Sequence, residues 1–382
     1  MDQKLVMPPP QSPRSSLTGA FLFLVLLALP PARAGIGENP DLETIFQFTL
    51  APSGLTSAPD GTWVLGVNQD EKPRLRAVRI SRSGDVSPFP NEKMSQGDPT
   101  SPTPLDAVEA LQTDPAGVVW MLDNGRRSEL PPKVVGWNHE KQRVQQVIHL
   151  SPPAVVPGSF VADLLVDAFS PLIVISDPAN GTNAALILLD RSTGIARRCL
   201  QGHPSLQPDP LVELRVTRTG QETRRLDGSA MMPHCGVRPL AMDRKGQWLY
   251  FAAVQSRVIY RLPTALLRAA DTSEEALAKA VEKYADKPAA ASFTLDNKNN
   301  LYLGDLESRS ISVIDPEHKT CRPITSDPRL VWPDGLCFGQ DGKLYFFSRT
   351  QATVAAPRDG RALGTEHSMF RMQPLAPGQP GN

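Results

Sequence analysis

The chain from Gly54 to Phe347 repeats one pattern six times. Each copy is an apolar run, then a polar turn usually containing Asp or Gly, then a second run rich in aromatic and β-branched residues. Alternating apolar residues have the period of a pleated strand, and Asp-Gly or Asn-Asn tolerates the positive φ of a tight turn. Each copy therefore predicts a β-hairpin. The copies are GLTSAPDGTWVLGV from Gly54, EALQTDPAGVVWMLD from Glu109, DLLVDAFSPLIVISD from Asp163, RPLAMDRKGQWLYFA from Arg238, ASFTLDNKNNLYLGD from Ala291 and DGLCFGQDGKLYFFS from Asp334.

The spacing of the hairpins indicates the architecture. The equivalent turn positions are Gly61, Gly117, Pro171, Gly246, Asn299 and Gly342, separated by 56, 54, 75, 53 and 43 residues. A four-stranded propeller blade takes roughly 40 to 50 residues. The sequence therefore predicts an all-β fold, a six-bladed β-propeller. The longest interval holds an insertion and not a seventh blade, and residues 42–50 are expected to add the outer strand of the last blade.

One short helical insertion is expected after blade four, near Thr264 to Tyr284. Ser273 and the two glutamates that follow it are typical of a helix start, and Leu277 and Val281 share a face with Tyr284. The 38 prolines suit a chain with many loops and few helices.

The N-terminus has the pattern of a secretory signal peptide. Lys4 and Arg14 precede an apolar run of 13 residues, 17–29, and Ala-Arg-Ala follows at 32–34. A membrane-spanning helix needs about 20 such residues. We expect residues 1–34 to be a signal peptide cut after Ala34, which predicts a secreted or periplasmic protein without stable membrane insertion. Residues 35–372 are then one propeller domain, and residues 373–382 are expected to be a disordered tail.

Charge and cysteine content exclude some functions. Basic and acidic residues number 40 each, which argues against a nucleic-acid partner, for which a basic excess is typical. The cysteines lack the clustered spacing of a zinc site. In an exported chain they permit two disulfides with three connectivities, and Cys337, within an apolar run, is equally suited to be a buried free thiol. The cysteines are Cys199, Cys235, Cys321 and Cys337.

Polar residues recur at the ends of the predicted hairpins. A hairpin returns to the side where it began, so the residue opening its first strand and the residue closing its second lie at one face of the propeller. The opening residues are Ser53, Glu109, Asp163, Arg238, Ala291 and Asp334, and the closing residues are Val67, Asp123, Asp177, Ala252, Asp305 and Ser348. Half are carboxylates, and the innermost strands line the central channel. The sequence therefore predicts an acidic channel mouth.

Clustered carboxylates require a cation among them, which is a metal ion, an organic amine or a nearby arginine. The local arginines are Arg126, Arg127, Arg238 and Arg309. Asp at a strand end is also a common turn former, so each acid has a purely structural alternative role. His234 precedes the fourth inner strand, where it reaches either the mouth or the interior of a long connection. The candidate ligand-binding residues are Glu109, Asp123, Asn124, Arg126, Asp163, Asp177, His234, Arg238, Asp305 and Asp334.

The chain contains no GxSxG, HExxH, Walker-type or GxGxxG motif. It does contain five segments that resemble the bacterial branch of the major royal jelly and yellow protein family, in the family's order between about Phe46 and Arg349. They are WMLDNGR from Trp120, ISD from Ile175, WLYFAAVQSRVIYRLPTALLR from Trp248, LGDLES from Leu303 and WPDGL from Trp332. This resemblance implies a secreted six-bladed propeller with a ligand pocket at the channel mouth.

Proteins of that family are associated with dopachrome conversion or with binding of small amines, and more distant six-bladed relatives include calcium-dependent lactonases. In those lactonases calcium is held by side chains at the first positions of inner strands, where the sequence motif is ligand residue, Gly, apolar residue. This chain keeps that motif only at residues 334–336. Glu109, Asp163 and Asp334 are the candidate calcium ligands, three of the six to eight oxygens that the ion prefers. Arg238 places a competing positive charge in the same ring.

Three functions are compatible with these residues. The first is binding of a small, aromatic or cationic molecule, with tautomerase-like proton transfer and with Asp123, Asp177 and Asp305 orienting the ligand. The second is a calcium-dependent hydrolase of lactones or esters, in which an acid or His234 activates water. The third is a non-enzymatic interaction platform. The sequence leaves open whether the protein is an enzyme.

Overall fold

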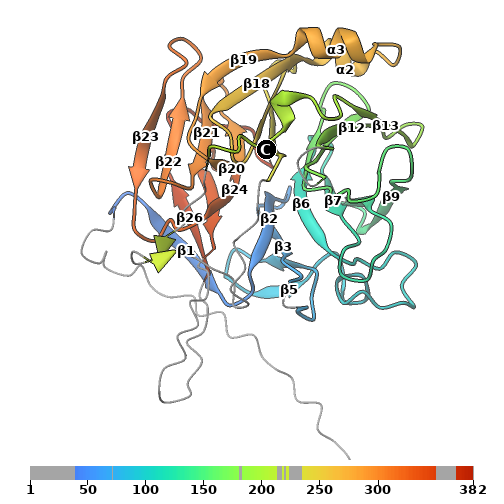
Figure 1. Ribbon diagram of the computed structural model, residues 1–382. Helices are drawn as coiled ribbons and strands as arrows, with labels where there is room; N and C mark the ends of the chain where they lie inside the picture. The colour runs from blue at the N-terminus through green and yellow to red at the C-terminus, as the bar shows by residue number, and fades with distance from the viewer. Residues whose placement is uncertain are drawn as a thin grey trace, which may run out of the picture.

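The computed structural model describes residues 39–70, 72–179, 183–212, 217–218, 221–222, 235–349 and 367–381. Six four-stranded antiparallel sheets are arranged in a ring, which confirms the predicted six-bladed β-propeller (Figure 1). Blade one is formed by β2 (Pro52–Ser57), β3 (Trp63–Val67), β4 (Ala77–Ile80) and β5 (Val86–Pro88). Blade two is formed by β6 (Val108–Thr113), β7 (Val118–Asp123), β8 (Lys133–Asn138) and β9 (Arg143–His149). The short helix α1 (Glu92–Ser95) lies between them in the chain.

The next three blades follow the same order. Blade three is formed by β10 (Asp163–Val166), β11 (Leu172–Asp177), β12 (Ala185–Asp190) and β13 (Ile195–Cys199). Blade four is formed by β16 (Val237–Met242), β17 (Trp248–Ala253), β18 (Val258–Pro263) and β19 (Glu282–Asp286). Blade five is formed by β20 (Ala290–Leu295), β21 (Leu301–Asp305), β22 (Ser310–Ile314) and β23 (Cys321–Ser326).

Blade six joins the two ends of the domain. Its inner strands are β24 (Pro333–Phe338), β25 (Leu344–Ser348) and β26 (His367–Met372). Its outer strand is β1 (Glu43–Phe48), which pairs antiparallel with β26. The expectation that residues 42–50 supply the outer strand of the last blade is therefore confirmed.

The six predicted hairpins form the two innermost strands of each blade. Five of the six turns are closed by backbone in the left-handed region, with φ between 62° and 77° at Gly61, Gly117, Gly246, Asn299 and Gly342. The same side-chain bonds recur at the turns. Asp114 Oδ2 accepts from Trp120 Nε1 at 2.9 Å, and Asp296 Oδ2 accepts from Tyr302 Oη at 2.9 Å. These bonds tie each turn to the strand that follows it.

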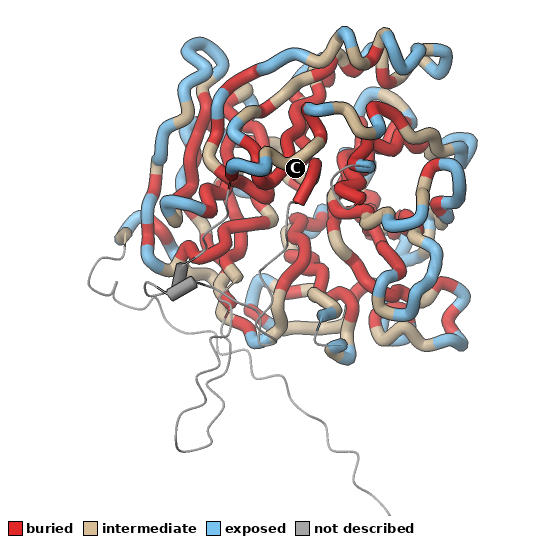
Figure 2. The backbone as a smooth tube through the Cα atoms, viewed as in Figure 1, coloured by how far each residue is buried: buried red, intermediate tan, exposed pale blue. Residues whose placement is uncertain are grey.

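The core lies between neighbouring blades. Figure 2 shows the inner strands as mostly buried, with exposure concentrated at the outer strands and loops. Side chains on the two faces of each sheet interlock with those of the next blade, as when Trp120 of β7 packs with Leu164 of β10. The largest buried side chains, including Phe251 and Phe338, fill these layers. The hydrophobic core of the propeller is therefore distributed between the blades around the ring.

The helical insertion lies inside blade four and not after it, which corrects the expectation. It contains two short helices between β18 and β19, α2 (Thr264–Arg268) and α3 (Glu274–Ala280). Ser273 caps α3 as expected, accepting from Ala276 N at 3.2 Å. Tyr284 belongs to β19, because residues 282–286 pair with β18 and its ring packs edge-on against Tyr250 at 4.7 Å.

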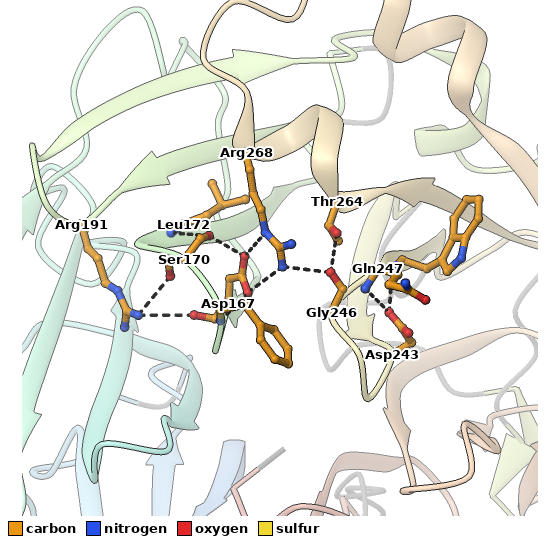
Figure 3. A network of polar contacts seen from close by, with 11 residues as sticks. Asp167, Ser170, Leu172, Arg191, Asp243, Gly246, Gln247, Thr264 and Arg268 are labelled. Carbon is orange, nitrogen blue, oxygen red and sulfur yellow. Dashed lines mark hydrogen bonds and ion pairs between the residues drawn. The ribbon is translucent and has the colours of Figure 1, made fainter.

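Helix α2 is fixed to blade three by a polar network at the turn face of the propeller (Figure 3). Arg268 donates to both oxygens of the buried Asp167, at 2.7 and 3.0 Å, and to Gly246 O at 2.9 Å. Thr264 Oγ1 also donates to Gly246 O. Arg191 donates to the carbonyls of Asp167 and Ser170 from the other side. The network joins the insertion to the turns of two blades.

The segment 373–381, expected to be a disordered tail, has a defined position across the turn end of the channel. Leu375 N donates to Tyr302 Oη at 2.7 Å, and Gly381 N donates to Phe338 O at 3.0 Å. A Cβ on Gly378 would lie 2.1 Å from Cδ2 of Phe338. The backbone of this segment bridges to Asp296, in the turn of blade five, and to Phe338 of β24, and its glycines permit the close approach. Figure 1 shows this end of the chain over the middle of the ring.

The long interval between blades three and four holds an insertion, as expected. Its described residues form η1 (Pro204–Leu206) and a small sheet of β14 (Thr217–Arg218) and β15 (Gln221–Glu222). All four cysteines are described and are free; Cys199, Cys235 and Cys337 are buried. In the described part of the chain, no helix has the length and apolar character to cross a membrane. The expected signal peptide, 1–34, lies outside the described residues.

Candidate functional site

A cavity of about 120 Å³ follows the propeller axis. All six residues that open the inner strands line it, which are Ser53, Glu109, Asp163, Arg238, Ala291 and Asp334. None of the six closing residues belongs to its lining. At the turn end the lining includes Asp296 and, from the segment 373–381, Gln379 and Gly381. We use the term mouth for the end where the inner strands begin, and floor for the turn end.

Asp123 has a structural role. Its side chain is fully buried and accepts backbone N–H groups from Asp106 and Ala107, each at 2.8 Å, and from Gly125 at 3.1 Å. Lys133 Nζ, also buried, lies 2.8 Å from Asp123 Oδ2. Both oxygens of this carboxylate are occupied by donors from the protein, and Asp123 does not line the cavity, so it does not orient a ligand there.

Asp177 and Asp305 are directed inward in the same way. Asp177 accepts from Phe160 N at 2.8 Å and forms a buried ion pair with Arg198 Nη1 at 2.6 Å. Asp305 accepts from the backbone of Glu307 at 2.8 Å and from the N–H and hydroxyl of Ser308. An Asp at a strand end commonly holds the next loop in this manner. The structural alternative therefore applies to all three closing acids.

The opening acids meet two guanidinium groups at the mouth. Asp334 Oδ2 lies 2.7 Å from Arg349 Nη2 and 3.7 Å from Arg238 Nη2. Asp334 Oδ1 accepts from Gly335 N at 2.8 Å. Arg349 also lies over the ring of Trp332, 5.6 Å from its centroid. The mouth is thus a mixed charge cluster, in which Arg349 joins the Arg238 that the sequence already placed among the acids.

Asp163 is the carboxyl group with the clearest acid–base character. Burial raises its pKa from 3.8 to about 7, and the positive charge of Arg238 only partly opposes this effect. Its oxygens accept from the backbone N–H groups of Leu164 at 2.9 Å and Leu240 at 3.1 Å, which hold the carboxyl in place. Asp163 therefore changes its protonation state near neutral pH.

Glu109 lies on the adjoining blade. Burial raises its pKa, with Arg238 and Arg349 opposing the rise. Asn124 Nδ2 donates to Glu109 Oε1 at 3.0 Å, so Asn124 positions this carboxyl group. Arg126 lies further out, more than half exposed, with its guanidinium 5.1 Å from the centre of the Phe160 ring. Arg126 is a residue of the rim.

The sequence interpretation missed Arg349. It directly follows Ser348, the closing residue of the sixth copy, and that position was the available signal. His234 lies outside the described residues. Its neighbour Cys235 is buried, and burial raises the pKa of its thiol.

The described residues do not fit a calcium cage. Asp334 is committed to Arg349, both oxygens of Asp163 accept backbone N–H groups, and two guanidinium groups occupy the surroundings. Calcium prefers six to eight oxygen ligands and no competing cation. Within the described ranges, no group of three or more His, Cys, Asp or Glu side chains is arranged to hold a metal ion.

Solved structures with the same architecture include three enzymes or binding proteins of low sequence identity. A luciferin-regenerating enzyme aligns with a TM-score of 0.56 at 11% identity, over 90% of this chain and 98% of its own. Regucalcin from Agrobacterium tumefaciens, described as a calcium-binding protein, aligns with a TM-score of 0.53 at 11% identity, over 87% and 92%. A gluconolactonase from Xanthomonas campestris aligns with a TM-score of 0.50 at 13% identity, over 90% and 95%. At these identities the likeness concerns the fold alone.

A comparison with curated protein sequences finds no match. The description of the major royal jelly protein family, in contrast, matches residues 107–365, which is well over half of the chain. That range includes the two innermost strands of blades two to six and every charged residue of the mouth cluster. The chain belongs to the major royal jelly protein family.

Proposed function

We propose that this protein binds a small aromatic molecule in the propeller channel and catalyses proton transfer on it, with a tautomerase-like activity of the kind that acts on dopachrome. The ligand enters at the mouth, and Asp163 is the proton-transferring group. One observation carries the proposal: Asp163 and Glu109 line a single cavity together with the guanidinium of Arg238, at the open end of that cavity.

The chemistry of a tautomerisation suits this set. A carbon–hydrogen bond breaks, its proton passes to a carboxylate, the electron pair moves onto a carbonyl oxygen, and a proton is then returned at another atom. A carboxyl group whose pKa is about 7 is present in both protonation states at neutral pH, as this exchange requires. Arg238, beside it, supplies positive charge where the oxygen becomes negative.

The observations favour this proposal over the two alternatives. A calcium-dependent hydrolase needs an oxygen cage, and the mouth presents guanidinium groups in its place. A purely structural platform gives no reason for a carboxyl group that titrates near neutral pH in a cavity. The fold-level likeness to a gluconolactonase does not decide between them, because propellers carry many unrelated functions.

The proposal is tested by following the loss of dopachrome absorbance with the purified protein and two variants. Asp163→Asn removes the titrating group and is expected to lower the rate by at least about a hundredfold. Asp286→Asn is the matched control, since Asp286 is a largely exposed acid on the outer strand of blade four that pairs with Lys283 and does not line the cavity. Absence of catalysis by the unaltered protein, or full activity of the Asp163 variant, would contradict the proposal.

We further propose that the protein is exported, that its partner is a small molecule and that it binds neither nucleic acid nor membrane stably. The N-terminal pattern of residues 1–34 and the balanced charge support this. Sequencing the mature N-terminus after expression tests the first part, with Gly35 as the expected first residue.

A further inference from the structure

The guanidinium of Arg238 has hydrogen-bonding capacity that the described residues do not use. Its side chain is 11% exposed, and its nearest acidic oxygen, Asp334 Oδ2, is 3.7 Å away, beyond hydrogen-bond range. Within the described ranges, this guanidinium donates no hydrogen bond. Its backbone carbonyl accepts from Ser176 Oγ at 2.8 Å. Five N–H donors therefore lie at a cavity wall.

Arg349 is hydrogen-bonded to Asp334, whereas Arg238 is only within ion-pair distance of it. Arg349 donates to Asp334 at 2.7 Å and covers the ring of Trp332. Asp334 is thus neutralised mainly by Arg349. The guanidinium N–H groups of Arg238 therefore remain available to hydrogen-bond a ligand that enters the mouth.

The carboxyl groups around Arg238 do not exclude an anion. Burial raises the pKa of Glu109 and raises that of Asp163 to about 7. Below pH 7 Asp163 is mostly neutral. Two guanidinium groups then face at most two negative charges, those of Asp334 and Glu109, so the cluster has no net negative charge.

We propose that Arg238 binds a carboxylate group of the ligand, so that the preferred ligand of this channel is a small aromatic acid or zwitterion and not a simple amine. A planar guanidinium matches a carboxylate in a two-bond fork, which makes this the strong polar contact of the site. The cavity volume of about 120 Å³ is of the order of a cavity, roughly 150 Å³, that holds a benzene ring. The inference rests on the proposed function, because it assumes that the ligand enters this mouth.

The test compares benzoate with benzylamine, two probes with one ring and opposite charge. Binding to the purified full chain is measured by calorimetry at pH 6. Benzoate is expected to bind and benzylamine is not. Arg238→Met is expected to weaken benzoate binding by about tenfold or more, and Arg238→Lys by less, since lysine keeps the charge without the fork.

Arg74→Met is the matched control, because Arg74 is 75% exposed, pairs with Glu92 on the surface and does not line the cavity. It is expected to bind benzoate as the unaltered chain does. Equal or tighter binding of benzylamine would overturn the carboxylate inference while leaving the mouth as the ligand site. Unchanged benzoate affinity in both Arg238 variants would also overturn it. Binding of neither probe would overturn the inference together with the assumption about the mouth, and the dopachrome assay with Asp163→Asn tests the proposed function separately.

Discussion

Replacing Asp163 by asparagine is expected to flatten the pH dependence of the free energy of unfolding. Burial raises the pKa of this carboxyl from 3.8 to about 7 in the fold, so between these values the folded chain holds a proton that the unfolded chain has released. The contribution of Asp163 to the free energy of unfolding therefore falls as pH rises from about 4 to 7, and is constant outside that window. Each pKa unit corresponds to about 1.4 kcal/mol, which gives an upper bound of about 4 kcal/mol for the whole fall.

The expected value is smaller, because the carboxyl is partly exposed to solvent in the cavity, and about 1–3 kcal/mol is a realistic range. Two backbone N–H groups donate to the carboxyl of Asp163, and asparagine can accept from only one of them. The lost hydrogen bond lowers the free energy of unfolding by an amount that does not depend on pH. The diagnostic quantity is thus the slope. Urea unfolding of the unaltered chain and the variant at pH 4.5, 6 and 8 measures it. A difference in unfolding free energy that stays constant across these pH values would refute the assignment of a raised pKa to Asp163.

Three further outcomes follow from the contacts described above. Asp123→Asn leaves the buried ammonium of Lys133 without its counterion and is expected to lower the free energy of unfolding, measured in urea, by about 3–5 kcal/mol. The exposed control Asp286→Asn is expected to lower it by less than about 0.5 kcal/mol. A loss below about 1 kcal/mol for the Asp123 variant would contradict the structural role of Asp123. Calcium at millimolar concentration, or a chelator, is expected to shift the melting temperature by less than about 1 °C, whereas saturation of a real site would stabilise by about 2.7 kcal/mol at a hundred times its dissociation constant. Gly378→Val forces a side chain against Phe338 and is expected to cost about 1–3 kcal/mol and to remove hydrogen-exchange protection at Gly381; retained protection there would show that the floor does not depend on this close fit.

Much of the fold could be predicted because the same turn chemistry repeats. Asp-Gly and Asn-Asn turns between alternating apolar runs specify hairpins locally, and the repetition of six hairpins at five intervals, four of them similar, specifies the ring. The helical insertion was misplaced for the opposite reason. Residues 282–286 extend the apolar face of the preceding helix, but their pairing with β18 is a long-range contact that local periodicity does not contain. The course of 373–381 likewise depends on inner strands far away in the sequence.

The site was predicted in part. Register alone places the opening residues on one cavity, so Glu109, Asp163, Arg238 and Asp334 were accessible to sequence reasoning. The closing acids carry the same residue type, and only the loop amides that they accept distinguish them as structural, as with Asp123. Arg349 lies one position beyond the repeat, and its contact with Asp334 comes from the side chain reaching back to the mouth.

The pairing of β1 with β26 determines when the ring can close during synthesis. β1 is the first strand among the described residues, and its partner begins at His367, more than 300 residues later. Until β26 has been synthesised, β1 has no strand with which to pair. Once β26 is made, its outer edge pairs with β1, a segment synthesised much earlier. Contacts of such large sequence separation form slowly, and unpaired strand edges invite association with other chains. A circular permutant opened between β9 and β10 would make blade six from consecutive residues and would move this late step to another place in the ring.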